Sequence, residues 1–312
     1  MGGLGVVLWK ELNDNFSSKR FFIMFLIICF VGIAACYISA QNLRGSLEEF
    51  PTEQVFLRLF VVSGESIPSF ASFLAFFAPL LGVIFGFDAI NSEFSQRTVS
   101  RILAQPLHRD AWINGKFLAA FVTLAIMLTS IVLIIIGLGI AILGFPPDIG
   151  ELARIGLFLG VSVVYVGFWL ALGVLFSILL DRTVSSALAS IAVWIFFSFF
   201  IYMLAGVIAD KVVPLGPKAT VEAWVRHSYV KDLVLRFSPT TIFNEAISAI
   251  LIPTYRGLGL MALLSGEEIP SGPLSIGQSL LVVWPQLTVL FAMALICFAI
   301  SYAVFMRREI RT

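Results

Sequence analysis

The chain alternates between long uncharged apolar runs and short polar segments. The uncharged runs cover residues 21–43, 66–87, 117–147, 155–180, 183–209 and 269–306. A helix needs about 20 apolar residues to cross a hydrocarbon core about 30 Å thick, so each run is long enough to span a membrane. The runs are continuously apolar and do not alternate as the strands of a membrane barrel do. The pattern predicts an all-α integral membrane protein with six transmembrane helices, in a single transmembrane domain over residues 1–312.

Composition supports this prediction. Of the 312 residues, 59% are hydrophobic and only 12% are charged, and the mean hydropathy is +1.00. Soluble domains carry about 25% charged residues, so a large soluble core is disfavoured. The net charge of +1 gives no overall attraction for a polyanion, and no nucleic-acid partner is expected.

Basic residues are distributed unequally between the two sides of the predicted spans. If the N-terminus lies inside, the short outer loops hold only Arg44, Arg58 and Arg154. The inner segments then hold Lys10, Lys19, Arg20, Arg97, Arg101, Arg109, Lys116, Arg182, Arg307, Arg308 and Arg311. Because basic residues accumulate in cytoplasmic segments, we expect a multi-pass protein of the cell membrane with both termini in the cytoplasm.

The first polar segment, residues 1–20, begins apolar and becomes charged just before the first span. This pattern predicts an interfacial N-terminal helix on the inner membrane surface, with Trp9 at the depth of the lipid headgroups and followed by Lys10 and Glu11. The alternative is a frayed tail that carries ordinary cytoplasmic charges.

The only long outer loop covers residues 210–280 and contains a strong helix start. Ser238 is a favourable helix cap and Pro239 suits the first turn. Apolar residues including Ile242 and Phe243 follow at helical spacing, with Glu245 among them. The helix is too short to span, so we expect an outer interfacial or re-entrant helix that lies on the outer leaflet or dips into it.

The polar segment at residues 88–116 is the main surface predicted on the inner side, because the other inner turn is very short. Val99, Ile102, Leu103 and Leu107 share one helical face, and Arg97, Arg101 and Gln105 occupy the other. Pro106 should end or kink this helix and start a second, short one that carries Asp110 and Trp112. Such a helix would lie across the inner surface and display side chains to the cytosol, or would merely anchor a loop.

Several kinds of chemistry are missing from the sequence. There is no phosphate-binding loop, no spacing typical of a metal site and no candidate catalytic residue, so the chain itself is expected to bind no cofactor and no metal. The interiors of the predicted spans hold no charged residue, whereas ion-coupled transporters usually carry one. This absence disfavours, but leaves open, a secondary transporter or channel.

One pattern in the polar segment is more specific. Asp88, Glu93, Thr98, Leu103, Pro106, Arg109 and Lys116 stand in a D-x4-E-x4-T-x4-L-x2-P-x2-R-x6-K arrangement. This arrangement resembles the segment between the second and third helices of ABC transporter permeases of the ABC-2 type. The Trp-Lys-Glu-Leu start at residues 9–12 and the Ser-Pro-Thr-Thr element at 238–241 also resemble that family, and most of all its copper-enzyme-maturation branch, as for nitrous-oxide reductase. Arg97 departs from the glycine that the family commonly has there.

The resemblance implies two permease copies side by side, as a homodimer, and a separate ABC ATPase subunit that binds ATP and Mg and docks on each copy. Residues 88–116 would be the cytoplasmic coupling segment. The residues implied in ATPase coupling are Asp88, Glu93, Arg97, Thr98, Arg101, Leu103, Pro106, Arg109 and Lys116. The chain would then be the permease subunit of an exporter. Alternatively, it would transmit force without transport, acting on an outer-side accessory protein.

The predicted orientation can be tested by cysteine labelling in whole cells. Ser95→Cys and Thr312→Cys should react only with membrane-permeant reagents, and Gly216→Cys should also react with impermeant ones. Labelling of Ser95→Cys by an impermeant reagent from outside would reverse the orientation.

Overall fold

The protein is described from a computed structural model that covers residues 3–46, 54–64, 67–95, 108–216, 219–252 and 274–307. Within these ranges the chain forms helices joined by turns, and no strand occurs in them. The prediction of an all-α protein is confirmed.

The helices have the following bounds. They are α1 (Gly3–Phe16), α2 (Lys19–Ser46), α3 (Val55–Val61), α4 (Phe70–Gly86), α5 (Asn91–Ser95), α7 (Arg109–Leu143), α8 (Ile149–Leu179), α9 (Thr183–Ile195), a π-helical turn (Phe196–Phe200), α10 (Ile201–Val212), α11 (Val221–Leu235), α12 (Pro239–Leu251) and α14 (Ile276–Arg307).

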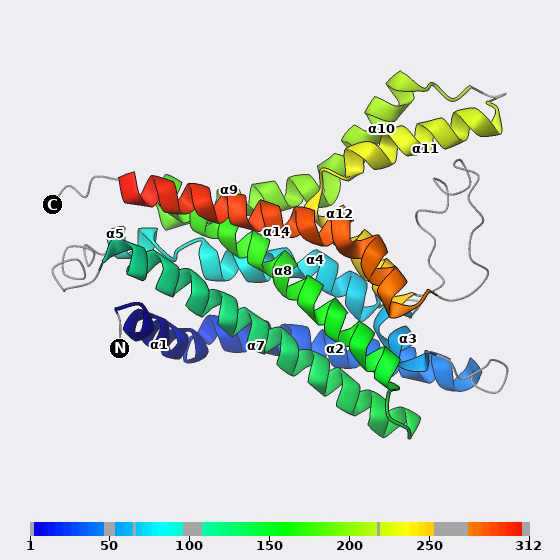
Figure 1. Cartoon of the computed structure of the whole chain (residues 1–312), viewed down its shortest axis with the longest axis horizontal. Coiled ribbons are helices and arrows are strands. Elements are labelled where there is room, and N and C mark those ends of the chain that lie inside the picture. The colour runs from blue at the N-terminus through cyan, green and yellow to red at the C-terminus, as the bar shows by residue number, and fades with distance from the viewer. Residues whose placement is uncertain are drawn as a thin grey trace.

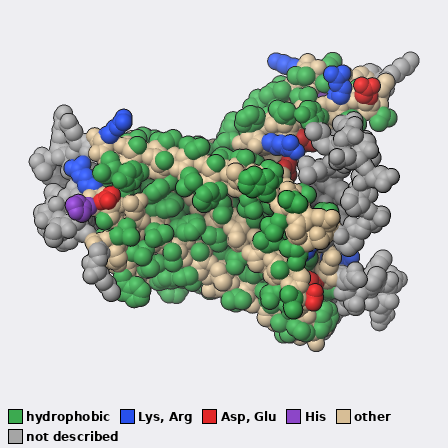
Figure 2. Space-filling model, viewed as in Figure 1, with side chains coloured by type: hydrophobic (Ala, Val, Ile, Leu, Met, Phe, Trp, Pro, Cys, Tyr) green, Lys and Arg blue, Asp and Glu red, His purple; other side chains and the backbone are tan. Residues whose placement is uncertain are grey.

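Six helical stretches in the described part of the chain are long and apolar enough to cross a membrane, and they match the six predicted runs. They are Lys19–Leu43, Phe70–Glu93, Arg109–Leu143, Ile149–Leu179, Thr183–Val212 and Ile276–Arg307. Except for α10, which ends the fifth of them, they lie side by side along the long axis of the molecule (Figure 1). We call the end with α1, α5 and the last turn of α14 the base, and the opposite end, with α3, the far end. The side chains along the middle of the visible face are mostly apolar, and charges gather toward the two ends (Figure 2).

Two helices form the centre of the bundle. In α4 and α8, 61% of the most apolar window is buried, against 33% or less in the other four spans. Gly82 and Gly86 lie on one face of α4, four residues apart, and a Cβ added to Gly82 would lie 2.6 Å from the Leu170 nitrogen of α8. A Cβ on Gly173 of α8 would in turn lie 3.1 Å from the Gly86 Cα. Small residues that let backbones approach are a main source of helix association in lipid, so this contact fixes α4 against α8.

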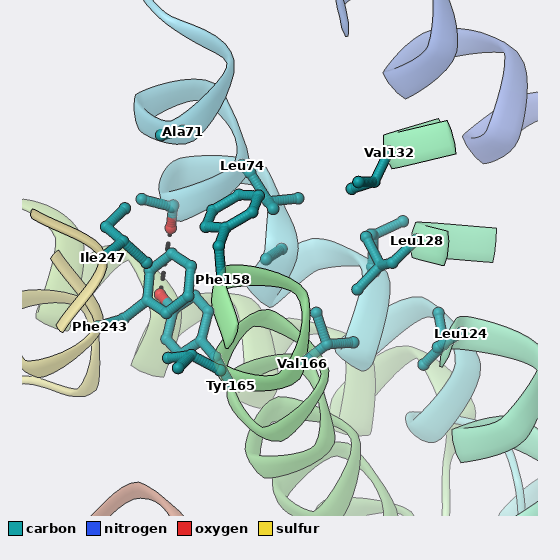
Figure 3. Packing of buried hydrophobic residues seen from close by; sticks show 14 of the residues in the cluster. Ala71, Leu74, Leu124, Leu128, Val132, Phe158, Tyr165, Val166, Phe243 and Ile247 are labelled. Carbon is teal, nitrogen blue, oxygen red and sulfur yellow. Dashed lines mark hydrogen bonds between the residues drawn. The ribbon is translucent and has the colours of Figure 1, made fainter. Parts of the chain in front are cut away.

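The helix α12 is not a surface element. Pro239, Ile242 and Phe243 are buried, and the Phe243 ring stacks on Tyr165, halfway along α8, with ring centroids 4.2 Å apart (Figure 3). The Tyr165 hydroxyl lies within hydrogen-bond distance of the Thr240 hydroxyl and donates to the Ala75 carbonyl of α4. The helix therefore buries its apolar face against α8 and α4. Its interfacial or re-entrant position at the outer leaflet stays a prediction.

The hairpin formed by α10 and α11 leaves the bundle near the far end (Figure 1). The π-helical turn before α10 shifts the backbone bonding, so that the Ile201 N–H donates to the Phe196 carbonyl. The Ser238 hydroxyl at the start of α12 donates to the Phe197 carbonyl at 3.2 Å. The hairpin therefore departs at the same place where α12 is attached. Such π-turns are frequent at functional positions.

Two features of the far end were not predicted. The short helix α3 has no favourable cap, because Gln54 at its N-cap has a left-handed backbone and makes no side-chain cap bond. The helix α8 begins at Ile149, six residues before the predicted span, because Asp148 and Glu151 form a capping box there. As a result, the charged residues Glu151 and Arg154 lie within the first turns of α8.

Substitution of the contact glycine tests the central helix pair. Gly82→Ala should lower the free energy of unfolding by about 1–3 kcal/mol, because the added methyl meets α8 backbone atoms that cannot rotate away. The measurement is the thermal unfolding midpoint of the purified protein in detergent, followed by tryptophan fluorescence. Gly160→Ala is the matched control, because a Cβ at Gly160 meets nothing within 4 Å. Equal midpoints for the two variants would contradict the close contact.

Candidate functional site

The base of the bundle holds a cluster of paired charges, which we call the base cluster: Glu11, Arg20, Asp88, Glu93 and Lys116. Five elements contribute one residue each: α1, the start of α2, the turn after α4, α5 and α7. The Lys116 ammonium lies 2.6 Å from Glu93 and 3.3 Å from Glu11, and the Arg20 guanidinium lies 2.6 Å from Asp88. The cluster joins helices that are far apart in the sequence.

Lys116 is the best-buried member of the cluster. Its side chain is only 10% exposed, and its ammonium also lies 5.6 Å from the centre of the Trp112 ring. Trp112 is buried and packs against Phe305 of α14. Partial burial strengthens charge pairing relative to an exposed pair, so Lys116 ties α5 and α1 to α7.

Arg20 makes the more exposed pair. Its side chain is about half exposed, and its guanidinium also lies over the Phe87 ring, 5.4 Å from the ring centre. Exposed ion pairs contribute little to stability, about 0–1 kcal/mol. The pair with Asp88 therefore positions the turn after α4 more than it stabilises the fold.

The backbone of the same turn is held by α8. The N–H groups of Ile90 and Asn91 both donate to the Ser177 hydroxyl oxygen, at 3.0 and 3.1 Å. The Asn91 side-chain amide donates to the Leu180 carbonyl. Buried backbone N–H groups require partners, so Ser177 fixes the point where α5 begins.

A cavity of about 280 Å³ lies beside the base cluster. Its polar lining includes the charged residues Glu11, Arg20, Asp88 and Lys116, and Phe85 is among its apolar lining residues. The two carboxylates and the two cations balance, and each is already paired. In the described residues no group of His, Cys, Asp and Glu side chains could hold a metal ion. The arrangement is suited to holding polypeptide segments together.

The structure groups only some of the residues predicted to couple to an ATPase. Asp88, Glu93 and Lys116 meet in the base cluster, and Arg109 opens α7. The remaining candidates, Arg97, Thr98, Arg101, Leu103 and Pro106, lie outside the described residues.

The separate short helix predicted for Asp110 and Trp112 is wrong. Both residues lie in the first turn of the long helix α7, which runs without a break into its membrane span. No helix-breaking proline follows Pro106 in this stretch, and Gly115 is accommodated because α1 packs on it. A Cβ there would lie 2.7 Å from the Val7 side chain.

The N-terminal helix α1 presents two different surfaces. Trp9 is 77% exposed, as expected for a residue at lipid headgroup depth. Lys10 is exposed and pairs with Glu11 and Asp14. Partial burial lowers the pKa of Lys10, but the carboxylates of Glu11 and Asp14 outweigh this effect and raise the pKa above its usual value. Glu11 also pairs with Lys116, at 3.3 Å, so α1 is bound to the predicted coupling segment. The sequence did not reveal this contact.

A second polar site lies at the far end and was missed at the sequence level. It borders a cavity of about 480 Å³ lined by Gln54, Asp148, Glu151, Arg154 and Ser275, among others. Glu151 and Arg154 are both more than nine-tenths buried. The sequence pattern that could have indicated them is an Asp-x-x-Glu capping box just before an apolar run, with an arginine three residues after the glutamate.

The candidate residues of α12 are held firmly. Ile242 and Phe243 belong to the core and Pro239 is buried. Glu245 is half-buried, with a carboxylate oxygen 3.7 Å from Arg236. None of the first three is displayed to a partner at the surface.

Comparison with known proteins agrees with this arrangement. The family model of the ABC-2 family transporter proteins matches residues 6–310. The chain is 26% identical to a probable ABC transporter permease protein NosY of Stutzerimonas stutzeri over 316 residues, which covers 96% of each chain. It is 30% identical to a protein of the same name from Pseudomonas aeruginosa over 201 residues, 61% of this chain and 66% of that one. Permeases of this family have no ATPase activity of their own and pair with ATPase subunits. With its six candidate spans, the chain belongs to the ABC-2 family of transporter permeases.

Proposed function

We propose that the protein is the permease subunit of an ABC exporter whose base faces the cytoplasm and receives the ATPase on residues 88–116. The observation that carries this proposal is the base cluster. Glu93 lies three residues before residues 96–107 and Lys116 lies nine residues after them, in the second turn of α7. The two side chains pair at 2.6 Å. The pair closes the two ends of this stretch onto the bundle, so a force applied to it would reach several helices at once.

The base cluster explains how docking would affect the membrane helices. Asp88 follows α4 directly, Lys116 begins the membrane part of α7, and their partners lie on α2, α5 and α1. Movement of residues 88–116 would therefore shift α4 and α7 together. ATP and Mg would be bound and used on the ATPase subunit, because the sequence of this chain contains no phosphate-binding loop.

A second permease copy is part of the proposal. The interior of one described chain is filled by large aromatic side chains, among them Phe158, Tyr165, Trp169 and Phe243. The two cavities described above lie at opposite ends of the bundle. This packing favours a substrate pathway between two permease copies. The homodimer and the outward direction of transport are added to the proposal from the family resemblance alone.

Force transmission without transport is the second candidate function. The hairpin of α10 and α11 projects from the bundle and exposes aromatic side chains, including Trp224 and Tyr229 (Figure 1). Exposed aromatic residues on a projecting element are typical of a protein-binding surface. Membership of the copper-enzyme-maturation branch, which the sequence resembles, would give this hairpin an outer-side accessory partner.

Charge reversal in the coupling segment tests the proposed docking. Arg97→Glu combined with Arg101→Glu should weaken ATPase binding by roughly 30-fold or more, because loss of a buried interface charge pair costs about 2–5 kcal/mol. The measurement is co-purification with the ATPase subunit of the same transporter, together with permease-stimulated ATP hydrolysis.

The matched control is Lys211→Glu combined with Arg226→Glu, which makes the same change in net charge on the hairpin away from the base. This control should leave both readouts unchanged. If the Arg97 and Arg101 reversal leaves ATPase binding and stimulation intact, the segment is only an anchor and the proposed docking is refuted.

A further inference from the structure

Besides the Tyr165 contacts in its middle, the helix α8 makes polar contacts with other elements at both of its ends. It holds the turn that leads into the coupling segment at the base, and it holds α3, α12 and α14 at the far end. We propose that α8, locked onto α4, carries movement of the coupling segment to the far end. Ser177 is the positioning residue at the input, and Glu151 and Arg154 are the positioning residues at the output. The inference rests on the proposed function, since it needs an ATPase that moves the coupling segment.

The input is a single hydroxyl that serves two backbone donors. In the turn after α4, the N–H groups of Ala89 and Ser92 have carbonyl partners within the turn itself. Those of Ile90 and Asn91 donate to Ser177 of α8. Ser177 is completely buried, so water is not an alternative partner. A displacement of this turn must therefore either move α8 or break both bonds.

The connecting element is stiff. The 31 residues of α8 extend about 46 Å at 1.5 Å per residue, enough to reach from the base to the far end. The glycine contact with α4 leaves no layer of side chains that could deform between the two backbones, because a Cβ on Gly86 would lie 2.7 Å from the Leu170 carbonyl oxygen. Packed interiors transmit displacement and do not absorb it, so α4 and α8 should move as one body.

The first output residue, Glu151, acts on the start of α3. One of its carboxylate oxygens accepts the Phe56 N–H at 2.9 Å, and the other accepts the Asp148 N–H at 2.9 Å. Phe56 is the second residue of α3, where free N–H groups and the helix dipole favour a negative charge. A charge on α8 thus supplies the cap that α3 lacks in its own sequence.

The second output residue, Arg154, acts on the end of α12 and the start of α14. Its guanidinium donates to the Ile250 carbonyl at 3.0 Å, to the Ser279 hydroxyl at 2.9 Å and to the Leu274 carbonyl. Ile250 lies in the last turn of α12, where free carbonyls and the dipole favour a positive charge. No ion pair of Arg154 occurs among the described residues, so its charge is directed at helix ends.

The two output residues lie close together on α8, so one movement of the helix would displace both. Glu151 and Arg154 are three residues apart and lie on neighbouring positions of one helical face. The negative residue holds the beginning of one short helix, and the positive residue holds the end of another. A shift or rotation of α8 would move α3 and α12 together.

A single cysteine at the far end reports on this transmission. Gln54→Cys, at the N-cap of α3 and on the wall of the far-end cavity, is placed in a chain with Cys29, Cys36 and Cys297 changed to alanine. The complex with its ATPase subunit is placed in lipid nanodiscs, and maleimide labelling rates are compared without nucleotide and with ATP plus vanadate. We expect the nucleotide to change the labelling rate of the parent.

Two variants should weaken that response. Ser177→Ala and Arg154→Met should each reduce the nucleotide-dependent change by about two- to tenfold, the effect of losing hydrogen bonds that couple two elements. Permease-stimulated ATP hydrolysis should persist in Arg154→Met, because Arg154 contacts only far-end elements among the described residues and touches no described residue of the docking segment. Ser162→Ala is the matched control, because this buried hydroxyl of α8 bonds only to the Phe158 carbonyl of its own helix.

The outcomes separate the inference from the function on which it rests. Absence of ATPase binding in the parent would refute the proposed function itself. The transmission proposal is overturned if the parent hydrolyses ATP but its labelling rate is the same with and without nucleotide. It is also overturned if the labelling rates of Ser177→Ala and Arg154→Met change with nucleotide as much as that of the parent. Should Arg154→Met fail to fold, Arg154→Lys and Glu151→Gln, which keep part of the bonding, should give responses between the parent and no response. Full parental responses in both would equally overturn the proposal.

Discussion

The contact between the α4 and α8 backbones is the constraint on which the rest of the structure depends. Gly82 and Gly86 let the α4 backbone approach α8, and Gly173 of α8 lets that helix approach Gly86. In lipid, apolar side chains gain little by leaving the hydrocarbon, so close packing and buried hydrogen bonds determine which helices associate. The short helix α12 then packs on this pair through Tyr165 and Phe243. The base turn is fixed by Ser177. A wider separation of α4 and α8 would loosen all of these contacts.

Charge is used sparingly and at the two ends of the bundle. The base cluster pairs opposite charges across helices, which ties the coupling segment to α1, α2 and α7. The far end uses Glu151 and Arg154 against the free backbone groups of helix ends. Between the two ends, polar side chains such as Thr123 and Ser162 bond to carbonyls of their own helices. The middle of the bundle therefore needs no ionised group to hold it, which is consistent with a permease that is powered by a partner.

The sequence predicted what depends on local composition. The six spans follow from the length of the uncharged runs, since the thickness of a bilayer imposes that length. The start of α12 followed from Ser238 and Pro239, whose capping chemistry is local. Asp88, Glu93 and Lys116 were selected together by their resemblance to a family pattern, and the structure does bring them into one cluster.

What could not be predicted depends on partners distant in the sequence. The pairing of Glu11 with Lys116 and of Arg20 with Asp88 requires the folded arrangement of α1 and α2. The start of α3 depends on Glu151 of α8, which accepts the Phe56 N–H. The burial of Arg154 depends on the hydrogen-bond acceptors that Ile250 of α12 and Ser279 of α14 supply. The predicted break near Asp110 was wrong because a proline at 106 suggested a second boundary where α7 in fact continues.

The most direct test of this account is a pair of electron cryomicroscopy structures of the permease with its ATPase subunit, without nucleotide and with ATP trapped by vanadate. The account predicts that α4 and α8 superpose as one rigid body between the two states, with the contact at Gly82 and Gly86 preserved. It also predicts that α3 and α12 follow that body when it moves relative to α2 and α7. A structure in which α8 slides along α4, or moves while α12 stays behind, would contradict it.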